Sequence, residues 1–212
     1  MDNNIASRNR LLAEKVIKGL ESRNMTGYYA ETKEEALKKA LEIIPEGSTV
    51  GWGGSVSVNE IGLKDAVING NYNALVRENC KTPEEKEKLQ REIFFSDYFL
   101  SSSNAVTEDG ILVNIDGNSN RIAAIAYGPQ HVLMIVGMNK VAKDLDSAVS
   151  RARNVAAPIN AQRFPLNTPC KKTGACANCK SIDSICCEFL ITRFSRHTGR
   201  IHVILVGEEL GY

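Results

Sequence analysis

A strand that runs into a glycine-rich turn and then into a helix is the feature that most constrains this fold. Residues 48–63 read STVGWGGSVSVNEIGL, and their β-branched start favours a strand. Three glycines then allow a sharp turn and a close approach of a ligand to the backbone: Gly51, Gly53 and Gly54. The segment matches neither the dinucleotide fingerprint nor the Walker loop with its lysine.

The residues after this turn predict a helix that begins near Val58. Ser57 and Glu60 have the spacing of a capping box, in which each side chain accepts a backbone N–H of the first turn. A helix start after a glycine turn suits an anion such as phosphate or carboxylate. A plain strand-to-helix turn explains the glycines equally well, and capping alone accounts for Glu60. Trp52, inside the turn, is expected to wedge the loop against the sheet.

Strands alternate with helices as far as residue 157, which predicts an α/β fold with an open, mostly parallel sheet and helices on both faces. We expect helices over 5–24, after Thr32, over 57–69, after Thr82, over 120–127 and over 144–157, the last ended by Pro158. We expect strands over 28–30, 48–50, 74–77, 94–100 and 131–137, and a terminal hairpin of 189–194 and 201–206. Residues 1–212 are expected to form a single domain. Ligands bind beyond the carboxyl ends of such strands, which selects the loops after Val50 and Leu100.

Composition narrows the class of protein. The 212 residues are 43% hydrophobic and 24% charged, as in a globular protein with one sizeable core. The net charge of +1 gives no reason to expect nucleic acid or a membrane surface as a partner. The sequence lacks a secretory apolar segment and any run near the ~20 residues that span a bilayer. We therefore expect a cytoplasmic protein without membrane insertion, in which thiols stay reduced.

Polar side chains crowd the segment 101–129, SSSNAVTEDGILVNIDGNSNRIAAIAYGP. If Glu108 and Asp116 share a cleft, their repulsion would raise one pKa and provide an acid and a base. Arg121 could bind a substrate carboxylate bidentately. The alternatives are purely structural: Asx-turns for the Asn and Asp residues and a surface ion pair for the arginine.

Five of the six cysteines lie between residues 170 and 187. Four follow the spacing C-x5-C-x2-C-x6-C: Cys170, Cys176, Cys179 and Cys186. Four thiolates suit Zn²⁺ or an iron–sulfur cluster such as [4Fe–4S], and three nearby lysines could offset the charge: Lys171, Lys172 and Lys180. Cys187 follows Cys186 directly, so only one of the two should face the site. The alternative is five reduced thiols without metal.

The remaining cysteine and the histidines are expected to be structural. Cys80 is isolated and is expected in the core. His131 and His202 lie in apolar, strand-like runs, where a hydrogen-bonded core histidine is the simplest interpretation. His197 lies in the predicted turn and is expected to be solvated.

Three stretches resemble the LUD-domain family, the lactate-utilization proteins: residues 51–63, 101–129 and 200–212. The resemblance is to a short branch with a cysteine-bearing C-terminal segment, here residues 164–187. It implies a fold similar to the ribose-5-phosphate isomerase and CoA-transferase superfamily, with a ligand site between the two loops. Carried over, the ligand-binding residues are Gly51, Gly53, Gly54, Ser55, Ser57, Asn104, Asp109, Asn114 and Arg121, with Glu60, Glu108 and Asp116 as catalytic candidates.

Three functions remain open at this point. The first is a lactate-utilization-type protein that binds a small carboxylate or phosphate, an oxidoreductase component whose cysteine centre carries electrons. Its partners would be iron–sulfur subunits of a lactate oxidase, or a second copy of this chain. The second is an isomerase- or transferase-like enzyme with Glu108 or Glu60 as base or nucleophile and a structural zinc. The third is a non-catalytic ligand sensor or assembly subunit.

Overall fold

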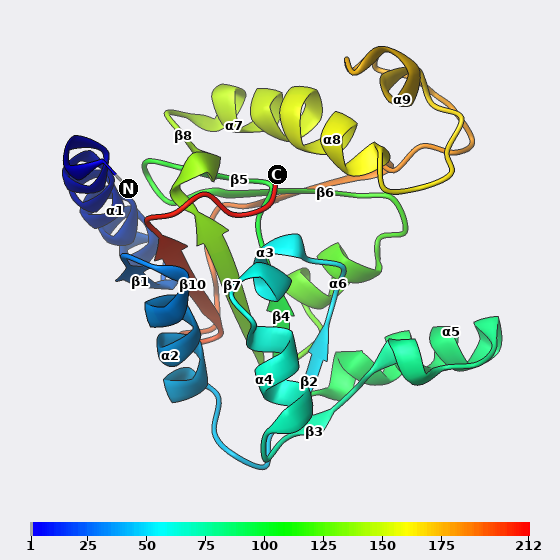
Figure 1. The fold of residues 1–212 in the computed structure, drawn as a ribbon, viewed down its shortest axis with the longest axis horizontal. Coiled ribbons are helices and arrows are strands. Elements are labelled where there is room, and N and C mark those ends of the chain that lie inside the picture. The colour runs from blue at the N-terminus through cyan, green and yellow to red at the C-terminus, as the bar shows by residue number, and fades with distance from the viewer. Residues whose placement is uncertain (1) are drawn as a thin grey trace.

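The computed structural model describes residues 2–212 as an α/β protein built on a six-stranded parallel sheet (Figure 1). The strands lie in the order β1 (Thr26–Ala30), β10 (Ile201–Val206), β7 (His131–Gly137), β4 (Tyr98–Ser101), β2 (Thr49–Trp52) and β3 (Asn73–Ala74). Every neighbouring pair is parallel. The predicted fold class is therefore confirmed.

Apart from His131 and His202 near their starts, the central strands β7 and β10 are apolar, as is typical of strands covered on both faces of a sheet. Val132 and Met134 point into one core, and Leu133 and Ile135 point into the other. The first core is closed by α1 (Asn3–Ser22) and α6 (Asn120–Ala126). The second is closed by α2 (Lys33–Ile43), α3 (Val56–Glu60) and α4 (Leu63–Asn69), which lie in front of the sheet in Figure 1. Helix α5 (Pro83–Glu92), flanked by the 3₁₀ turns η1 (Arg77–Asn79) and η2 (Ile93–Phe95), buries none of its residues and projects from the body.

A second, four-stranded sheet lies beyond the carboxyl edge of the first (Figure 1). Its order is β8 (Val141–Ala142), β5 (Ala105–Thr107), β6 (Leu112–Asp116) and β9 (Glu188–Thr192). Its outer face carries α7 (Leu145–Arg151), a π-helical segment (Ala152–Ala156) and α8 (Ala157–Ala161). The 3₁₀ turn η3 (Met138–Lys140) connects β7 to β8, and α9 (Pro169–Thr173) opens the cysteine segment.

Two helix starts follow their sequence signals, and one does not. Thr32 and Thr82 cap α2 and α5 by accepting the N–H groups of the residues three positions later. The predicted capping box of Ser57 and Glu60 is wrong, because Ser55 caps α3 through a 3.3 Å bond to the N–H of Val58. Gly62, with φ of +75°, then ends α3 and separates it from α4.

The predicted terminal hairpin is also wrong. Strand β10 inserts between β1 and β7 in the first sheet, whereas β9 pairs antiparallel with β6 in the second. The two runs differ in their burial: four consecutive residues at the end of β10 are buried, while Phe189 and Ile191 of β9 are exposed. A continuous apolar run is typical of a strand covered on both faces rather than of a hairpin edge.

Pro158 does not end its helix as predicted. The helical path continues from α7 through the π-helical segment into α8, where Pro158 stands in the first turn. A proline cannot donate the i→i−4 bond and its ring crowds the preceding turn. The wider π-helical turn directly before it accommodates this defect.

Two glycines allow the turn between β5 and β6 to touch helix α1. A Cβ on Gly19 would lie 2.4 Å from the carbonyl carbon of Asp109, and a Cβ on Gly110 would lie 2.4 Å from that of Gly19. Arg23, directly after α1, donates to the backbone oxygen and to the carboxylate of Asp109. The tip of this hairpin is therefore fixed to α1 by direct backbone contact.

We expect Gly110→Ala to lower the free energy of unfolding by about 3 kcal/mol or more, because it combines backbone strain with a backbone clash. Gly47→Ala is the matched control: Gly47 has a similar φ of +81° against +87° for Gly110, but nothing lies within 4 Å of its Cβ position. That control should cost only about 1 kcal/mol. Urea denaturation of both variants measures the difference, and equal losses would refute the proposed contact.

Candidate functional site

A cavity of about 500 Å³ opens at the carboxyl edge of the parallel sheet. The segments that follow four strands line it: residues 54–57 after β2, 102–104 after β4, Lys140 after β7, and 211–212 after β10. The structure therefore brings together the loops after Val50 and Leu100, as the sheet topology predicts.

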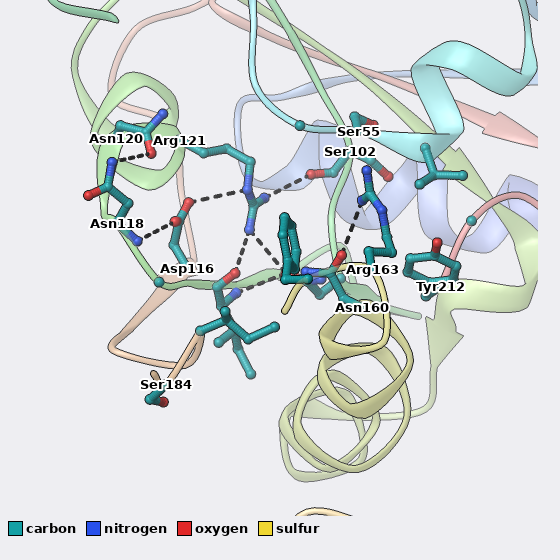
Figure 2. Close-up of a pocket in the computed structure, with 18 of the residues that line it drawn as sticks. Ser55, Ser102, Asp116, Asn118, Asn120, Arg121, Asn160, Arg163, Ser184 and Tyr212 are labelled. Carbon is teal, nitrogen blue, oxygen red and sulfur yellow. Dashed lines mark hydrogen bonds and ion pairs between the residues drawn. The ribbon is translucent and has the colours of Figure 1, made fainter. Parts of the chain in front are cut away.

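The far wall of the cavity comes from the second layer. Asn160 and Arg163 extend from α8 and the turn after it, and residues 182–185 come from the cysteine segment. In Figure 2, Asp116 and Arg121 lie on one side of the cavity, and Arg163 and Tyr212 lie on the other.

Arg121 lies in a dense set of acceptors. Its two terminal nitrogens donate four hydrogen bonds of 2.6 to 3.3 Å, to the backbone oxygens of Ser102 and Ile115 and to Oδ1 of Asn104 and Asn114. Its Nε lies 3.3 Å from Oδ2 of Asp116, whose side chain is only 10% exposed. A guanidinium has five N–H groups; the hydrogen bonds use the four on the terminal nitrogens, and the fifth, on Nε, lies beside Asp116. Arg121 therefore holds the β5–β6 hairpin to α6 and has no donor free for a bidentate substrate contact.

Other cations keep donors free for a ligand. Among residues 2–212, the side chain of Arg163 donates one hydrogen bond, 3.1 Å from Nη1 to Oδ1 of Asn160, and Nε of Arg77 lies 3.6 Å from Oε1 of Glu78. Of the charged side chains along the cavity, four are cationic and two are anionic: Arg77, Arg121, Lys140 and Arg163 against Asp116 and Asp183. The site is thus electrostatically suited to a small anion.

Lys140 lies at the floor of the cavity and is 3% exposed. Its Nζ is 2.9 Å from Oγ of Ser57 and 3.1 Å from Oγ of Ser102. In the described part of the chain, no carboxylate forms an ion pair with it. The pKa of Lys140 is lowered to about 7, chiefly by burial; the charges of Arg151 and Arg121 contribute to the lowering, and that of Glu60 opposes it.

Glu60 fastens the last residues over this lysine. Its Oε2 accepts the N–H of Gly211 at 2.8 Å, and Asn139 Oδ1 accepts that of Leu210 at 3.2 Å. A Cβ on Gly211 would lie 2.8 Å from Oγ of Ser57 and 3.3 Å from Nζ of Lys140. Glu60 does not line the cavity, so here it positions the 210–212 segment.

Glu108 and Asp109 do not reach the cavity that Asp116 lines. The β5–β6 hairpin leaves the cavity at Asn104 and returns at Asp116, which puts its tip roughly 14 Å away at about 3.4 Å per residue. There Glu108 forms a 2.5 Å ion pair with Lys15, and Asp109 pairs with Arg23. The geometry therefore does not provide the Glu108–Asp116 pair on which acid–base catalysis would depend.

The other predicted residues divide into two groups. Those that line the cavity are Gly54, Ser55, Ser57, Asn104, Asp116 and Arg121. Gly51, Gly53 and Asn114 lie behind it: a Cβ at Gly51 would clash with Ile93, and one at Gly53 would lie 3.2 Å from the Arg121 side chain. Trp52 is 4% exposed within the second core, which agrees with a wedge rather than a stacking platform.

A second, small cavity of about 60 Å³ lies among the cysteines. Four of them line it: Cys170, Cys176, Cys179 and Cys186. Cys187 does not; it is exposed, and its Sγ donates to the backbone oxygen of Ser184. The pKa of Cys186 is raised to about 11, chiefly by burial and then by the neighbouring thiols, Cys176 first.

Local turns place hydrogen-bonding groups next to two of the thiols that line this cavity. In the sequence CANC, Asn178 has φ of +49°, and its N–H donates to Sγ of Cys176 at 3.5 Å. Thr168 Oγ1 lies 3.3 Å from Sγ of Cys170. The cation beside this cavity is Arg153, from the π-helical segment, which donates to Oδ1 of Asn178 at 2.6 Å. Lys171, by contrast, donates to the backbone oxygens of Gln162 and Phe164.

The four cysteine side chains line a cavity and do not meet around one position that a single metal ion could occupy. Within residues 2–212, no three His, Cys, Asp or Glu side chains lie close enough together to hold a single metal ion. A tetrahedral zinc site needs thiols only about 3.8 Å apart, given Zn–S bonds near 2.3 Å. As placed in residues 2–212, the four thiols therefore do not form a site for a single zinc ion.

The residues expected to be structural lie away from both cavities. His131 and His202 stand near the starts of β7 and β10, each beside the carbonyl oxygen of Gly199, at 3.0 and 2.8 Å. His197 is exposed, as expected. Cys80 is only half-buried, just before α5, rather than in the core.

Sequence reasoning missed Lys140, Arg163 and Arg153. Lys140 occurs in the sequence MNKVAKD, which is typical of an ordinary solvent-exposed loop. Its one signal is position: it follows the buried strand β7, whose carboxyl end lies beside those of β4 and β10. Arg153 comes from the π-helical segment and Arg163 from the turn after α8, and only the tertiary structure gives the placement of these elements over the sheet edge.

Fold and site together define an open α/β protein with a cation-lined cavity at the carboxyl edge of its sheet and a thiol-lined cavity beside it. The chain belongs to the LUD-domain family, whose model matches residues 13–206. A crystal structure of a DUF162 family protein from Deinococcus radiodurans is similar in fold, with a TM-score of 0.52 and 12% identity over 95% of this chain and 98% of that one. Comparison with curated proteins found no match. Among residues 2–212, no helix combines the length and apolarity needed to cross a bilayer.

Proposed function

We propose that this protein is a metabolic protein of the lactate-utilization type, which binds a small carboxylate or phosphate in the larger cavity beside a redox centre held by the four cysteines. Membership in the LUD-domain family supports the broad assignment. The observation that carries the rest is that the two cavities share a wall: Ser184 and Ile185 line both.

The anion half of the proposal depends on the cations of the cavity. Within residues 2–212, Arg163 and Arg77 keep N–H donors without a hydrogen-bond partner, and Lys140 adds a third positive group when protonated. Arg121 contributes charge without direct contact, because its donors are already taken. A carboxylate or phosphate of metabolite size fits within about 500 Å³.

The cysteine half depends on the fit of the thiols to a cluster. Cys170, Cys176, Cys179 and Cys186 would hold an iron–sulfur cluster, and N–H···S contacts such as that of Asn178 are the kind that tune cluster potentials. Arg153 would offset part of its negative charge. When bound, such a cluster supplies one-electron transfer. The shared wall would place that centre next to the ligand.

Calorimetric titration with lactate, pyruvate and inorganic phosphate tests the anion half. We expect saturable binding of at least one of them and a loss of about tenfold or more in affinity in Arg163→Ala, because a charged hydrogen bond contributes about 1.5 kcal/mol or more. Arg91→Ala is the control, since this arginine is exposed on α5 and does not line the cavity. Absence of binding, or equal losses in both variants, would reject this half.

Elemental analysis and visible spectroscopy of protein purified without oxygen test the redox half. Iron, acid-labile sulfide and visible absorption are the expected result. Colourless protein with stoichiometric zinc would exclude electron transfer at the cysteines and leave the anion half standing.

A further inference from the structure

We propose that Lys140 is a nucleophile that forms an imine with the carbonyl group of a small anionic oxo compound bound in the larger cavity. The class of ligand is a carbonyl compound that carries a carboxylate or a phosphate, such as a 2-oxo acid or a triose phosphate. The inference deepens the proposed function and rests on its anion-binding half.

The surroundings of Lys140 differ from those of an ordinary structural lysine. A buried ammonium is normally paired with a carboxylate, since an unpaired buried charge is costly. Here the side chain is 3% exposed, and its partners are two neutral hydroxyls, Ser57 and Ser102. Glu60, the acid whose charge acts on Lys140, accepts the N–H of Gly211. Such an environment suits a neutral amine better than an ammonium ion.

The hydrogen bonds leave the reactive electron pair of the amine free. The hydroxyl of Ser102 donates to the backbone oxygen of Ser103, so it accepts from Lys140. Ser57 provides a second acceptor at 2.9 Å. A neutral amine has two N–H groups and one lone pair, so both N–H groups can be used while the lone pair remains for the cavity.

Charged neighbours on each packed element act on this amine. Arg151 of α7 and Arg121 of α6 favour the neutral form, and Glu60 of α3 favours the charged form. With a pKa of about 7, roughly half of the molecules carry a neutral Lys140 at pH 7. Desolvation and nearby cations are the means by which proteins activate lysine nucleophiles.

The chemical step balances without a further reactant. Nζ of Lys140 adds to the carbonyl carbon, and a proton from nitrogen moves to the carbonyl oxygen to give a carbinolamine. That oxygen then leaves as water with the second nitrogen proton, and a C=N bond remains. Ser57, at 2.9 Å from Nζ, is positioned to relay the proton. The anionic end of the ligand would face Arg163 or Arg77 across the cavity.

Trapping with sodium borohydride tests the proposal on the full-length protein at pH 7. Pyruvate and dihydroxyacetone phosphate serve as separate probes, one for carboxylate and one for phosphate, and peptide mapping locates the reduced adduct. We expect one adduct per chain, at Lys140, with about tenfold or more higher occupancy than at the exposed Lys143. Adducts with neither probe, or adducts spread over exposed lysines, would overturn it.

Two variants sharpen the result. Lys140→Arg keeps the positive charge without an imine-forming amine and should abolish the adduct, while Lys143→Arg should leave it unchanged. If Lys140→Arg fails to fold, the peptide map of the wild-type protein still decides, since it identifies the modified lysine directly.

Titration with lactate and glycerol 3-phosphate separates this inference from the proposed function, because both carry the anion without the carbonyl. Binding of either, together with no trapping of pyruvate or dihydroxyacetone phosphate at Lys140, would overturn the imine and retain the anion site. No binding of any of the four compounds would reject both.

Discussion

Replacement of Arg121 by methionine is expected to lower the free energy of unfolding by about 3–5 kcal/mol, among the largest losses for a single side chain here. The substitution removes four hydrogen bonds and leaves the carboxylate of Asp116, 10% exposed, without its cation. Breaking a buried ion pair from one side is costly because the remaining charge stays desolvated. For a chain of this length the melting temperature should fall by roughly 10 °C.

A double-mutant cycle shows whether the ion pair is the cause. Asp116→Asn in the Arg121→Met background should recover part of the loss, because no unpaired charge then remains. Arg91→Ala, at a 77% exposed side chain on α5, should change stability by no more than about 0.5 kcal/mol. A loss below about 1 kcal/mol in Arg121→Met would contradict the role assigned to its contacts.

Cys186→Ser is expected to abolish most of the iron bound after anaerobic purification, whereas Cys187→Ser is expected to retain it. The two residues are adjacent, but Cys186 lines the thiol cavity, while Cys187 is exposed and bonded to the backbone of Ser184. Loss of one of four thiolates leaves a cluster with an open, labile corner.

Iron and sulfide per chain, with the visible spectrum, measure this contrast. The neighbouring position makes Cys187→Ser a matched control for local disturbance of the segment. Equal iron in both variants would remove Cys186 from the set of ligands, and loss of iron in Cys187→Ser alone would reverse the assignment.

Local signals in the sequence identify most of the elements. Thr32 and Thr82 cap helices as their spacing predicts, and the apolar run 131–137 is the strand β7 itself. The terminal hairpin fails because nearness in sequence favours pairing, while the burial of β10 on both faces demands a place inside the parallel sheet. Local sequence patterns cannot decide between a hairpin and a place inside the parallel sheet, because the partner strands of β10 lie far away in sequence.

The sequence predicts where the candidate site lies but does not identify all of the residues that line it. Sheet topology selects the loops after β2 and β4, and the structure joins them in one cavity. Within the acidic loop, however, sequence does not separate Asp116 from Glu108, because their separation depends on the length and direction of the β5–β6 hairpin. The role of Lys140 cannot be read from the sequence for a related reason: its neighbours come from α3, the loop after β4 and the 210–212 segment, which only the tertiary fold brings together.

The way in which Glu60 fastens Gly211 has a practical consequence for protein production. Tyr212 lines the cavity, and the residue before it has no room for a side chain beside Ser57 and Lys140. An affinity tag fused directly after Tyr212 would start at a residue that lines the cavity and would compete with the proposed ligand for that space. Tags for the binding and trapping experiments therefore belong before α1, whose first turn is exposed.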